Sequence, residues 1–331
     1  MTRFADGGIS LGVSQSHVVA DGKSLWDFMV AWGECARGHH VHGPMPRPVH
    51  ERERLALDGP PSEDVAKQYT AKLERNRGLF TDSHGGGGIN HVKLPEPEKE
   101  PRTGMETGLV QCVFVLTPSS IEKLKAEAGG SYTSYEVMCA HFWRKVTQAR
   151  LSPPDTKVRF MVMANLRSKM DPPLPPSYFG NVLDTTSCDA RAANVLGEEL
   201  GHTARRIHEA VLMCTPDSLV ANIHWLELRG NSSADARKDW GEFQMMGAVS
   251  SPRFPAYQVE FGWGRPAAVR SAKVPGDGEM VLFGGREGFE AGVGDIEICV
   301  GLPSHVIGRL LDDPTFLAKP VSNPFHYYYN K

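Results

Sequence analysis

The chain has 331 residues, of which 40% are hydrophobic and 23% are charged. This balance is typical of a globular protein and excludes a fibrous or wholly disordered one. Lys and Arg number 36 against 39 Asp and Glu, a net charge of -3, so a basic surface for nucleic acid is not expected. The longest apolar run, residues 109–116, is too short to cross a bilayer.

The N-terminus and the cysteines indicate where the protein resides. No charged segment leads into an apolar core at the start of the chain, so no secretory signal is expected. Most cysteines lie in apolar stretches without a CxxC pair, which predicts buried, reduced thiols in a cytoplasmic protein rather than disulfides or a zinc site. These cysteines are Cys35, Cys112, Cys139, Cys188, Cys214 and Cys299.

The first 38 residues predict a strand, a tight turn and an amphipathic helix. Apolar residues alternate from Ile9 to Val13, as in a half-buried strand. Asp21-Gly22 is a turn signal, Ser24 is the expected helix N-cap, and Gly38 ends the helix. The face of this helix repeats at spacings of three and four through Leu25, Phe28, Met29, Trp32 and Cys35.

Composition divides the chain near its first third. A polar helix is expected over residues 63–77, and a run of four glycines, residues 85–88, is followed by a Pro-, Glu- and Lys-rich stretch. Low apolar content makes this stretch a linker. The predicted organisation is an N-terminal part over residues 1–84, a crossover loop over residues 85–105, and a C-terminal domain over residues 106–331.

The C-terminal domain mixes helices and strands without the strict βαβ rhythm of a doubly wound sheet. Strands are expected over 109–116 and 158–164 and around Gln258, Val281 and Ile296. Helices are expected over 117–129, after the N-cap Thr133, twice between 193 and 229, and over 305–311. The predicted fold class is α+β.

The segment His17-Val-Val-Ala-Asp21-Gly22 carries the clearest chemistry. A histidine that leaves a strand at a turn before a helix can project into a cleft, and its ordinary pKa suits a general base. The Asp-Gly turn argues against a helical metal pair of His17 and Asp21. By itself the motif is also compatible with a hydrogen-bonded histidine beside a turn aspartate.

A second motif, Glu260-Phe261-Gly262-Trp263-Gly264, favours the catalytic interpretation of His17 over the hydrogen-bonded one. The pair of motifs resembles the HxxxDG and DFGWG motifs of the BAHD acyltransferases, the plant family that uses acyl-CoA donors. Further blocks match in the same order, from about residue 3 to residue 317. They include residues 26–37, 134–144, 165–167, Tyr178-Phe-Gly-Asn181, 285–288 and 295–299.

The resemblance implies two chloramphenicol-acetyltransferase-like domains with the active site between them. It implies that His17 takes a proton from a hydroxyl or amine acceptor, which then attacks an acyl-CoA thioester of hydroxycinnamoyl, acetyl or similar type. In the family the motif aspartate, here Asp21, turns away from the substrate and pairs with an arginine, for which Arg167 stands in the matching position. The second motif supports the architecture. Acyl-CoA is a co-substrate, and no further cofactor or metal is implied.

Two departures from the family pattern bear on the site. Glu260 stands where the family usually has Asp, which retains the charge on a longer side chain and predicts a rearranged local ion pair. Val249-Ser250-Ser251 stands where hydroxycinnamoyl transferases of the family often have Thr-Ser-Trp, and the absence of that Trp argues against a shikimate-type acceptor. Ser250 or Ser251 could donate to a developing oxyanion, or both could simply form the turn before Pro252.

In the family the first motif lies well inside the chain, whereas here it begins at residue 17. The resemblance therefore predicts that the first domain is incomplete. Family members are usually monomeric, but an uncovered apolar face would favour association. The alternative function is a catalytically inactive, truncated member that binds CoA esters or a protein. A cluster of His39, His40 and His42 is interpreted as a solvated loop rather than a metal site.

Overall fold

The computed structural model describes residues 1–38, 47–78, 108–229, 240–272, 274–285 and 294–321. The strands in these ranges are β1 Thr2–Arg3, β2 Ile9–Ser10, β3 Leu109–Leu116, β4 Lys157–Asn165, β5 Leu183–Arg191, β6 Gln244–Ala248, β7 Glu279–Gly284, β8 Ile296–Pro303 and β9 Lys319–Pro320. The α-helices are α1 Gly22–Ala36, α2 Glu63–Gly78, α3 Pro118–Ala128, α4 Ser134–Ala149, α5 Ala192–Gly197, α6 Leu200–Leu212, α7 Pro216–Arg229 and α9 Ser304–Asp312.

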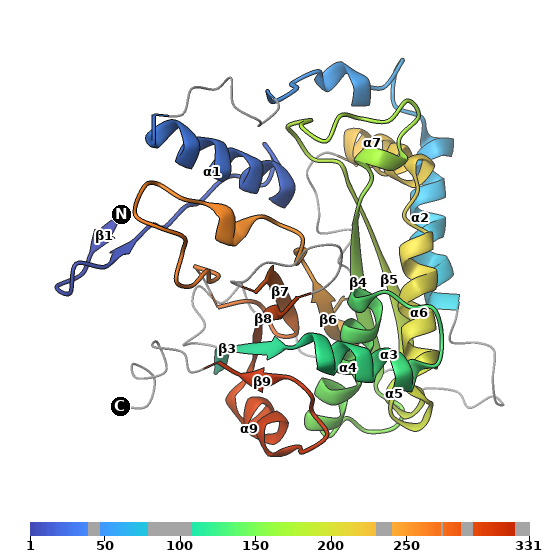
Figure 1. Ribbon diagram of the computed structural model, residues 1–331. Coiled ribbons are helices and arrows are strands. Elements are labelled where there is room, and N and C mark those ends of the chain that lie inside the picture. Colours follow the sequence, from blue (N-terminus) through green and yellow to red (C-terminus); the bar gives the residue numbers. More distant parts are fainter. Residues whose placement is uncertain (39–46, 79–107, 230–239, 273, 286–293, 322–331) are drawn as a thin grey trace.

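A mixed sheet of seven strands organises the described part of the chain, in the order β5-β4-β6-β7-β8-β3-β9. The central pairs β4–β6 and β6–β7 are parallel, and the outer pairs are antiparallel. This arrangement confirms the α+β class. β1 and β2 form a separate two-stranded ribbon that projects from the body of the molecule (Figure 1).

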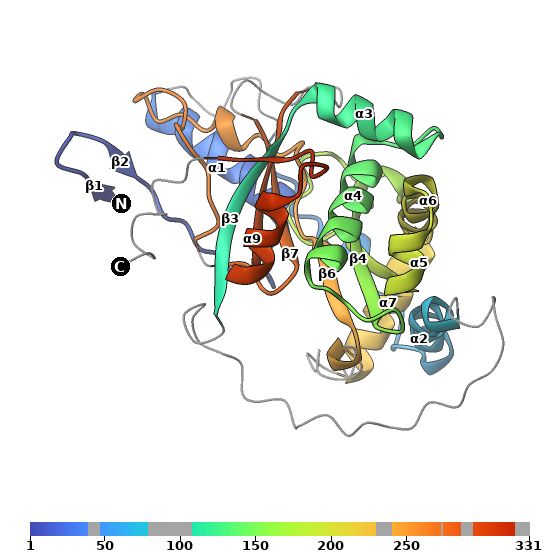
Figure 2. The same cartoon turned by 90° about the horizontal axis from the view of Figure 1, so that it is seen from below.

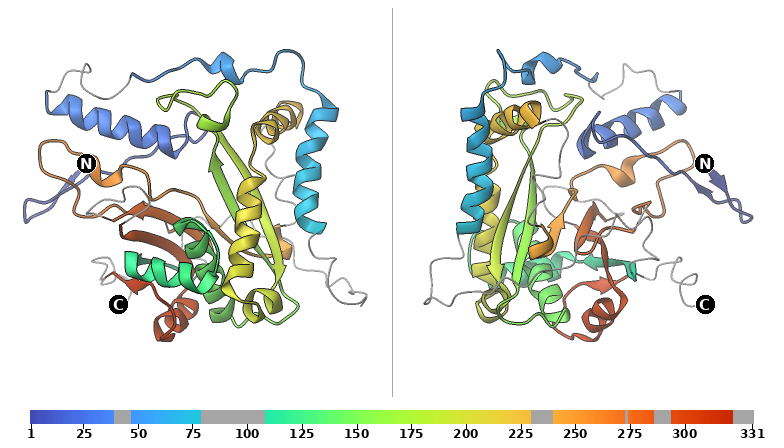
Figure 3. Two further views of the ribbon diagram at one scale, coloured as in Figure 1. Left: turned by 45° about the vertical axis from the view of Figure 1, so that its right-hand side comes forward. Right: turned by 180° about the vertical axis from the view of Figure 1, so that it is seen from behind.

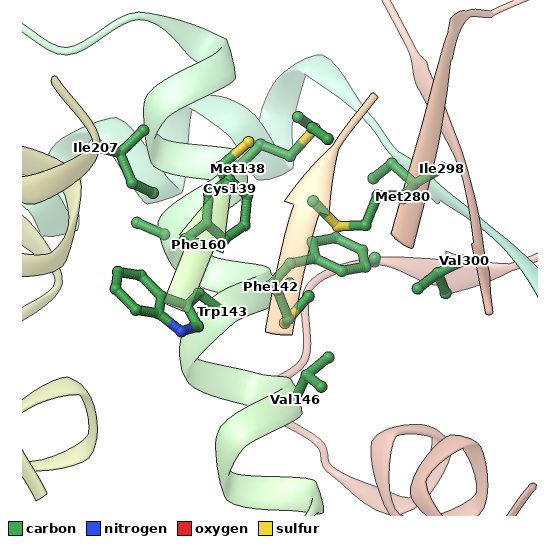
Figure 4. Packing of buried hydrophobic residues seen from close by; sticks show 14 of the residues in the cluster. Met138, Cys139, Phe142, Trp143, Val146, Phe160, Ile207, Met280, Ile298 and Val300 are labelled. Atoms are coloured by element: carbon green, nitrogen blue, oxygen red, sulfur yellow. The ribbon is translucent and has the colours of Figure 1, made fainter. Parts of the chain in front are cut away.

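The main core lies between one face of this sheet and the helices α3, α4, α6 and α9. Helix α4 lies between α9 and α6 (Figure 2) and is buried along most of its length. Its Met138, Phe142 and Trp143 are fully buried. They lie close to Phe160 of β4 and Met280 of β7 (Figure 4). The predicted capping box of α4 is present, because the Thr133 hydroxyl accepts from the Glu136 amide and the Glu136 carboxylate accepts from the Thr133 amide.

Helix α2 packs against α7 and β5. Both views of Figure 3 place α2 and α1 on opposite sides of the β4–β5 pair. Lys72 of α2 forms a buried ion pair with Asp184 of β5, with Nζ and Oδ2 2.6 Å apart. Within residues 1–84, α2 therefore packs against elements of the C-terminal part. The predicted domain boundaries stay a prediction, and the loop 85–105 lies outside the described residues.

The N-terminal segment differs from its prediction at several points. The strand covers only β2, and the N-cap of α1 is Asp21 instead of Ser24, because the Asp21 carboxylate accepts from the Ser24 amide. Met29 is buried on the predicted apolar face, but Phe28 is 52% exposed and Trp32 is 42% exposed. Figure 1 shows α1 above the segment that follows β6. The spacing of the apolar residues therefore predicted the helix correctly, but it did not predict which segment packs against its apolar face.

Two other predictions in the C-terminal part were wrong. Residues 193–229 form three helices rather than two, and the strand expected around Gln258 is a short 3-10 helix, Ala256–Gln258. The central strand β6 was not predicted. It is only five residues long, and its Gly247 packs so closely on β4 that a Cβ would lie 2.9 Å from the Met161 Cβ.

The cysteines match their prediction except for Cys35, which is exposed on α1, whereas the other five are buried. Burial raises the pKa of the Cys112, Cys214 and Cys299 thiols to about 11. No described helix is long and apolar enough to span a bilayer. His39, His40 and His42 lie outside the described residues.

His141 of α4 gives the fold a pH dependence. Its ring is buried, stacks on Phe316 and accepts from the Leu317 amide at 3.2 Å. Burial lowers its pKa from 6.5 to about 3, so the folded chain keeps it neutral over a range in which the unfolded chain protonates it. Its contribution to stability is therefore complete above pH 6.5 and decreases as the pH falls toward 3.

Because of this histidine, we expect the free energy of unfolding to fall by at most about 1.4 kcal/mol for each pH unit below 6.5. Urea unfolding of wild type and His141→Gln between pH 7 and pH 5 measures this contribution, and the variant should show the shallower decline. His305→Gln, at an exposed histidine of α9, is the control. Equal declines for wild type and His141→Gln would contradict the assignment.

Candidate active site

His17 lies on the turn that connects β2 to α1, and its side chain is exposed. The turn is closed by a hydrogen bond from the Val19 amide to the Ser16 carbonyl oxygen at 3.1 Å. The Asn181 side chain donates to the His17 carbonyl oxygen at 2.7 Å. An exposed imidazole on an anchored backbone is accessible to a substrate that must give up a proton.

Asp21 forms a fully buried ion pair with Arg167, at the end of β4. The two guanidinium nitrogens Nη1 and Nη2 donate to Oδ2 at 2.7 Å and to Oδ1 at 3.0 Å. The Asp21 carboxylate also accepts from the amides of Ser24 and Val182. With both oxygens occupied in this way, the carboxylate fixes the backbone after His17 and points away from the exposed turn.

Residues 178–182, between β4 and β5, form the surface on which this pair rests. The Gly180 carbonyl oxygen accepts from the Asp21 amide at 3.3 Å, from Arg167 Nη2 at 2.9 Å and from the Ser24 hydroxyl at 3.2 Å. Arg167 Nε donates to the Tyr178 carbonyl oxygen. The anchoring roles of Ser24 and Gly180 were not predicted, because they depend on contacts across more than 150 positions of sequence.

The second motif lies against α1. Arg37, at the end of that helix, donates from Nη1 to the Glu260 carboxylate at 2.8 Å. Glu260 therefore forms a local ion pair, and its rearrangement relative to the family stays a prediction. Gly22 brings the start of α1 against Phe254, because a Cβ there would lie 2.9 Å from the Phe254 ring. Helix α1 thus connects the two motifs, because the first motif leads into its start and the second motif meets its end at Arg37.

The aromatic residues of the second motif continue the contact with α1. Trp32 meets Phe261 edge to face with ring centroids 5.1 Å apart, and Phe261 stacks on Trp263 at 5.7 Å. Gly262 and Gly264 have φ of +91° and +90°, which a residue with a Cβ adopts only under strain. The glycines therefore allow backbone turns at which the loop presents Phe261 to α1, while Trp263 stays 61% exposed.

The close approach between α1 and this loop occurs at Gly33. A Cβ at that position would lie 2.3 Å from the Glu260 carbonyl oxygen. Gly33→Ala must therefore shift the helix or the loop, and we expect a loss of about 1–3 kcal/mol in the free energy of unfolding. Gly308→Ala in α9 is the matched control, because its Cβ meets no atom within 4 Å. Chemical denaturation of both variants checks the prediction, and equal stabilities would contradict it.

Ser250 and Ser251 have different environments. The Ser250 hydroxyl donates to the Leu282 carbonyl oxygen at 2.7 Å and accepts from the Leu282 amide at 2.5 Å, so it extends the pairing of β6 with β7. Its hydrogen therefore points to the sheet. Ser251 is half-buried, and its hydroxyl oxygen accepts from the Arg253 amide in the turn at Pro252. The Ser250 hydroxyl thus already donates to the backbone, whereas in its described contact the Ser251 hydroxyl only accepts.

The loop that carries the second motif is anchored to β8 by a polar cluster that the sequence did not reveal. The Tyr257 hydroxyl donates to the Glu297 carboxylate, and Arg270 pairs with the same carboxylate at 2.8 Å. Burial and the neighbouring carboxylate raise the pKa of Tyr257. Among the described residues, no group of three or more His, Cys, Asp or Glu could hold a metal ion.

Comparison with known proteins identifies a family. The model of the Transferase family matches residues 1–316. The chain is 29% identical over 313 residues to a hydroxycinnamoyltransferase of Narcissus pseudonarcissus, covering 93% of this chain and 66% of that protein. It is 31% identical over 275 residues to shikimate O-hydroxycinnamoyltransferase of Nicotiana tabacum, covering 80% of this chain and 58% of that protein. It is 29% identical over 331 residues to BAHD acyltransferase DCR of Arabidopsis thaliana, covering 96% of this chain and 61% of that protein.

The chain spans about three fifths of the length of the curated relatives it matches. Several solved structures share its fold, among them TRI101 and vinorine synthase. F. sporotrichioides TRI101, complexed with coenzyme A and T-2, is 17% identical with a TM-score of 0.61, covering 91% of this chain and 65% of that one. Vinorine synthase is 20% identical with a TM-score of 0.59, covering 89% of this chain and 59% of that one. The chain therefore belongs to the Transferase family, the family of BAHD acyltransferases that its motifs resemble.

Proposed function

We propose that the protein transfers an acyl group, of hydroxycinnamoyl type, from an acyl-CoA thioester to a hydroxyl or amine acceptor. Family membership supports the reaction class, and the names of the relatives from N. pseudonarcissus and N. tabacum support the acyl group. The coenzyme A complex of TRI101 supports the donor. The thioester already activates the acyl group, so the proposed reaction requires no resident cofactor.

The observation that carries the proposal is the exposed His17 on a turn whose next residues are fixed by the buried Asp21–Arg167 pair. His17 removes the proton from the acceptor oxygen or nitrogen as that atom attacks the thioester carbonyl carbon. The tetrahedral intermediate then collapses with cleavage of the C–S bond. The protonated His17 gives this proton to the departing CoA sulfur, so CoA leaves as the thiol and His17 returns to its neutral form.

Asp21 has a positioning role in this proposal. Its carboxylate accepts four hydrogen bonds, from Arg167, Ser24 and Val182, and it is fully buried, so proton relay through it is disfavoured. For the oxyanion of the intermediate we propose Ser251 as the side-chain donor, because Ser250 is bonded to β7. Removal of one such donor lowers kcat by about 100-fold or more in well-studied cases.

An assay of thiol release tests the proposal. Purified protein is incubated with a panel of acyl-CoA donors, p-coumaroyl-, caffeoyl- and acetyl-CoA among them, together with alcohol and amine acceptors that include shikimate. Free CoA is measured with a thiol reagent, and the acylated product by mass spectrometry. Acceptor-dependent release supports the transferase. Binding of CoA esters without release, by a chain that is folded by circular dichroism, supports the alternative of a non-catalytic CoA-ester-binding protein.

We also propose a cytoplasmic location, supported by the five buried thiols with no cysteine in a disulfide.

A further inference from the structure

The turn that carries His17 depends on side chains for its shape. Residues 11–21 contain no helix or strand, so no ladder or helical turn holds their backbone in place. Each carbonyl oxygen from Ser16 to Ala20 nevertheless accepts a hydrogen bond. The donors are the Val19 amide for Ser16, the Asn181 side chain for His17 and Val18, Arg52 for Val19, and Gln15 for Ala20.

Asn181 makes the shortest of these hydrogen bonds. Its Nδ2 donates to the His17 carbonyl oxygen at 2.7 Å and to the Val18 carbonyl oxygen at 3.2 Å. Arg52 reaches the Val19 carbonyl oxygen only at 3.4 Å. Both partners of Asn181 are acceptors, so the contact needs an N–H donor at this place, which a carboxylate does not have.

Asn181 lies between two residues that are hydrogen-bonded to Asp21. Its neighbours Gly180 and Val182 are hydrogen-bonded to Asp21 through their backbone. The same short segment therefore holds Asp21 on one side and the His17 carbonyl on the other. Because the His17 imidazole is exposed, the backbone, rather than packing around the ring, sets the direction in which it projects.

We propose that Asn181 is a positioning residue for the transfer reaction, which fixes the His17 turn so that the imidazole is aimed at the acceptor. This inference rests on the proposed function. Asn181 acts through His17 and does not touch the reacting atoms. A misplacement of about 1 Å can cost on the order of 100-fold in rate, so loss of this contact should lower kcat more than it changes KM.

The sharpest variant is Asn181→Asp, which keeps the shape of the side chain but places a carboxylate oxygen against two carbonyl oxygens. We expect kcat about 100-fold lower, with KM for the acyl-CoA donor within about threefold of wild type. Asn181→Ala should give a smaller loss, since it removes the donor without adding repulsion. Asn194→Ala is the matched control, because the described side-chain hydrogen bond of Asn194 is to the nearby Glu198, the residue that follows α5.

A double-mutant cycle separates positioning from a general structural effect. In a chain that already carries His17→Ala, Asn181→Asp should lower the residual rate by less than about twofold, because there is no imidazole left to aim. An equal loss in both backgrounds would overturn the inference, as would full activity of Asn181→Asp. If wild type itself transfers no acyl group, the proposed function fails and this role fails with it. A wild type that is active beside an unaffected Asn181→Asp would contradict the Asn181 role alone.

Discussion

Replacement of Arg167 by methionine is expected to lower the free energy of unfolding by about 3–5 kcal/mol. The change leaves the buried Asp21 carboxylate without its cationic partner, and Asp21 is fully buried while Arg167 is 3% exposed. It also removes donors from the carbonyl oxygens of Tyr178 and Gly180. Urea unfolding at pH 7, followed by circular dichroism, measures the loss.

Arg191→Met is the matched control for this variant. Arg191 also pairs with an aspartate, Asp155, but at 3.3 Å and on the surface, where Asp155 is 95% exposed. Such a pair contributes about 0–1 kcal/mol. Comparable losses in the two variants would contradict the assigned importance of the buried pair.

Hydrogen exchange gives Arg167→Met a second readout. The ion pair ties residues 17–24 to the connection between β4 and β5, so its loss should release this segment before the sheet unfolds. Amides of α1 should therefore exchange faster in Arg167→Met, while those of β8, in the centre of the core, should keep their protection. Uniform acceleration across the chain would indicate that the pair stabilises the fold as a whole rather than the site.

Much of the fold could be predicted from the sequence because its cause is local. The run Leu109–Leu116 forms β3, and the capping pair Thr133 and Glu136 begins α4 as expected. These outcomes depend on side-chain alternation and on hydrogen bonds across three residues, both of which a sequence displays. The short strand β6 has neither signal, and its position is set by its neighbours β4 and β7.

The candidate site could be predicted only in part, because its contacts span the chain. Ser24 and Asp21 are both good N-caps, and the choice of Asp21 goes with its contact to Arg167, 146 positions away. Only the family resemblance suggested that partner. Ser250 and Ser251 are adjacent and chemically alike, and they differ because Ser250 lies opposite Leu282 of β7. Nothing in the local sequence encodes that difference.

The apolar face of α1 illustrates the same limit. Its spacing predicted a helix with one side toward a core, yet Phe28 and Trp32 remain largely exposed. Trp32 contacts Phe261 in the loop of the second motif, and Trp26 of the same helix contacts Phe283 of β7. Periodicity specifies which side chains share a face, whereas the partner of that face comes from tertiary structure. Association through this exposed apolar face stays a prediction. Sedimentation of wild type beside a Phe28→Ser variant tests it.

Replacement of His17 by alanine is expected to lower kcat by about 100- to 10,000-fold, the usual contribution of a positioned general base. Stability should change by less than about 0.5 kcal/mol, because the side chain is exposed and its loss opens no cavity. These two expectations together distinguish the residue from Arg167, whose loss should act through stability. His305→Ala, at an exposed histidine of α9, should leave both quantities unchanged.

Chemical rescue makes the His17 test specific for proton transfer. Added imidazole can enter the space left by the exposed side chain and accept the acceptor's proton, so it should restore part of the lost rate in His17→Ala while leaving wild type unaffected. The rate is measured as acceptor-dependent thiol release at saturating donor. A variant that keeps more than about a tenth of wild-type activity would show that His17 is not the base. Loss of activity without rescue, in a chain of wild-type stability, would instead assign His17 to substrate binding, with a rise in KM as its mark.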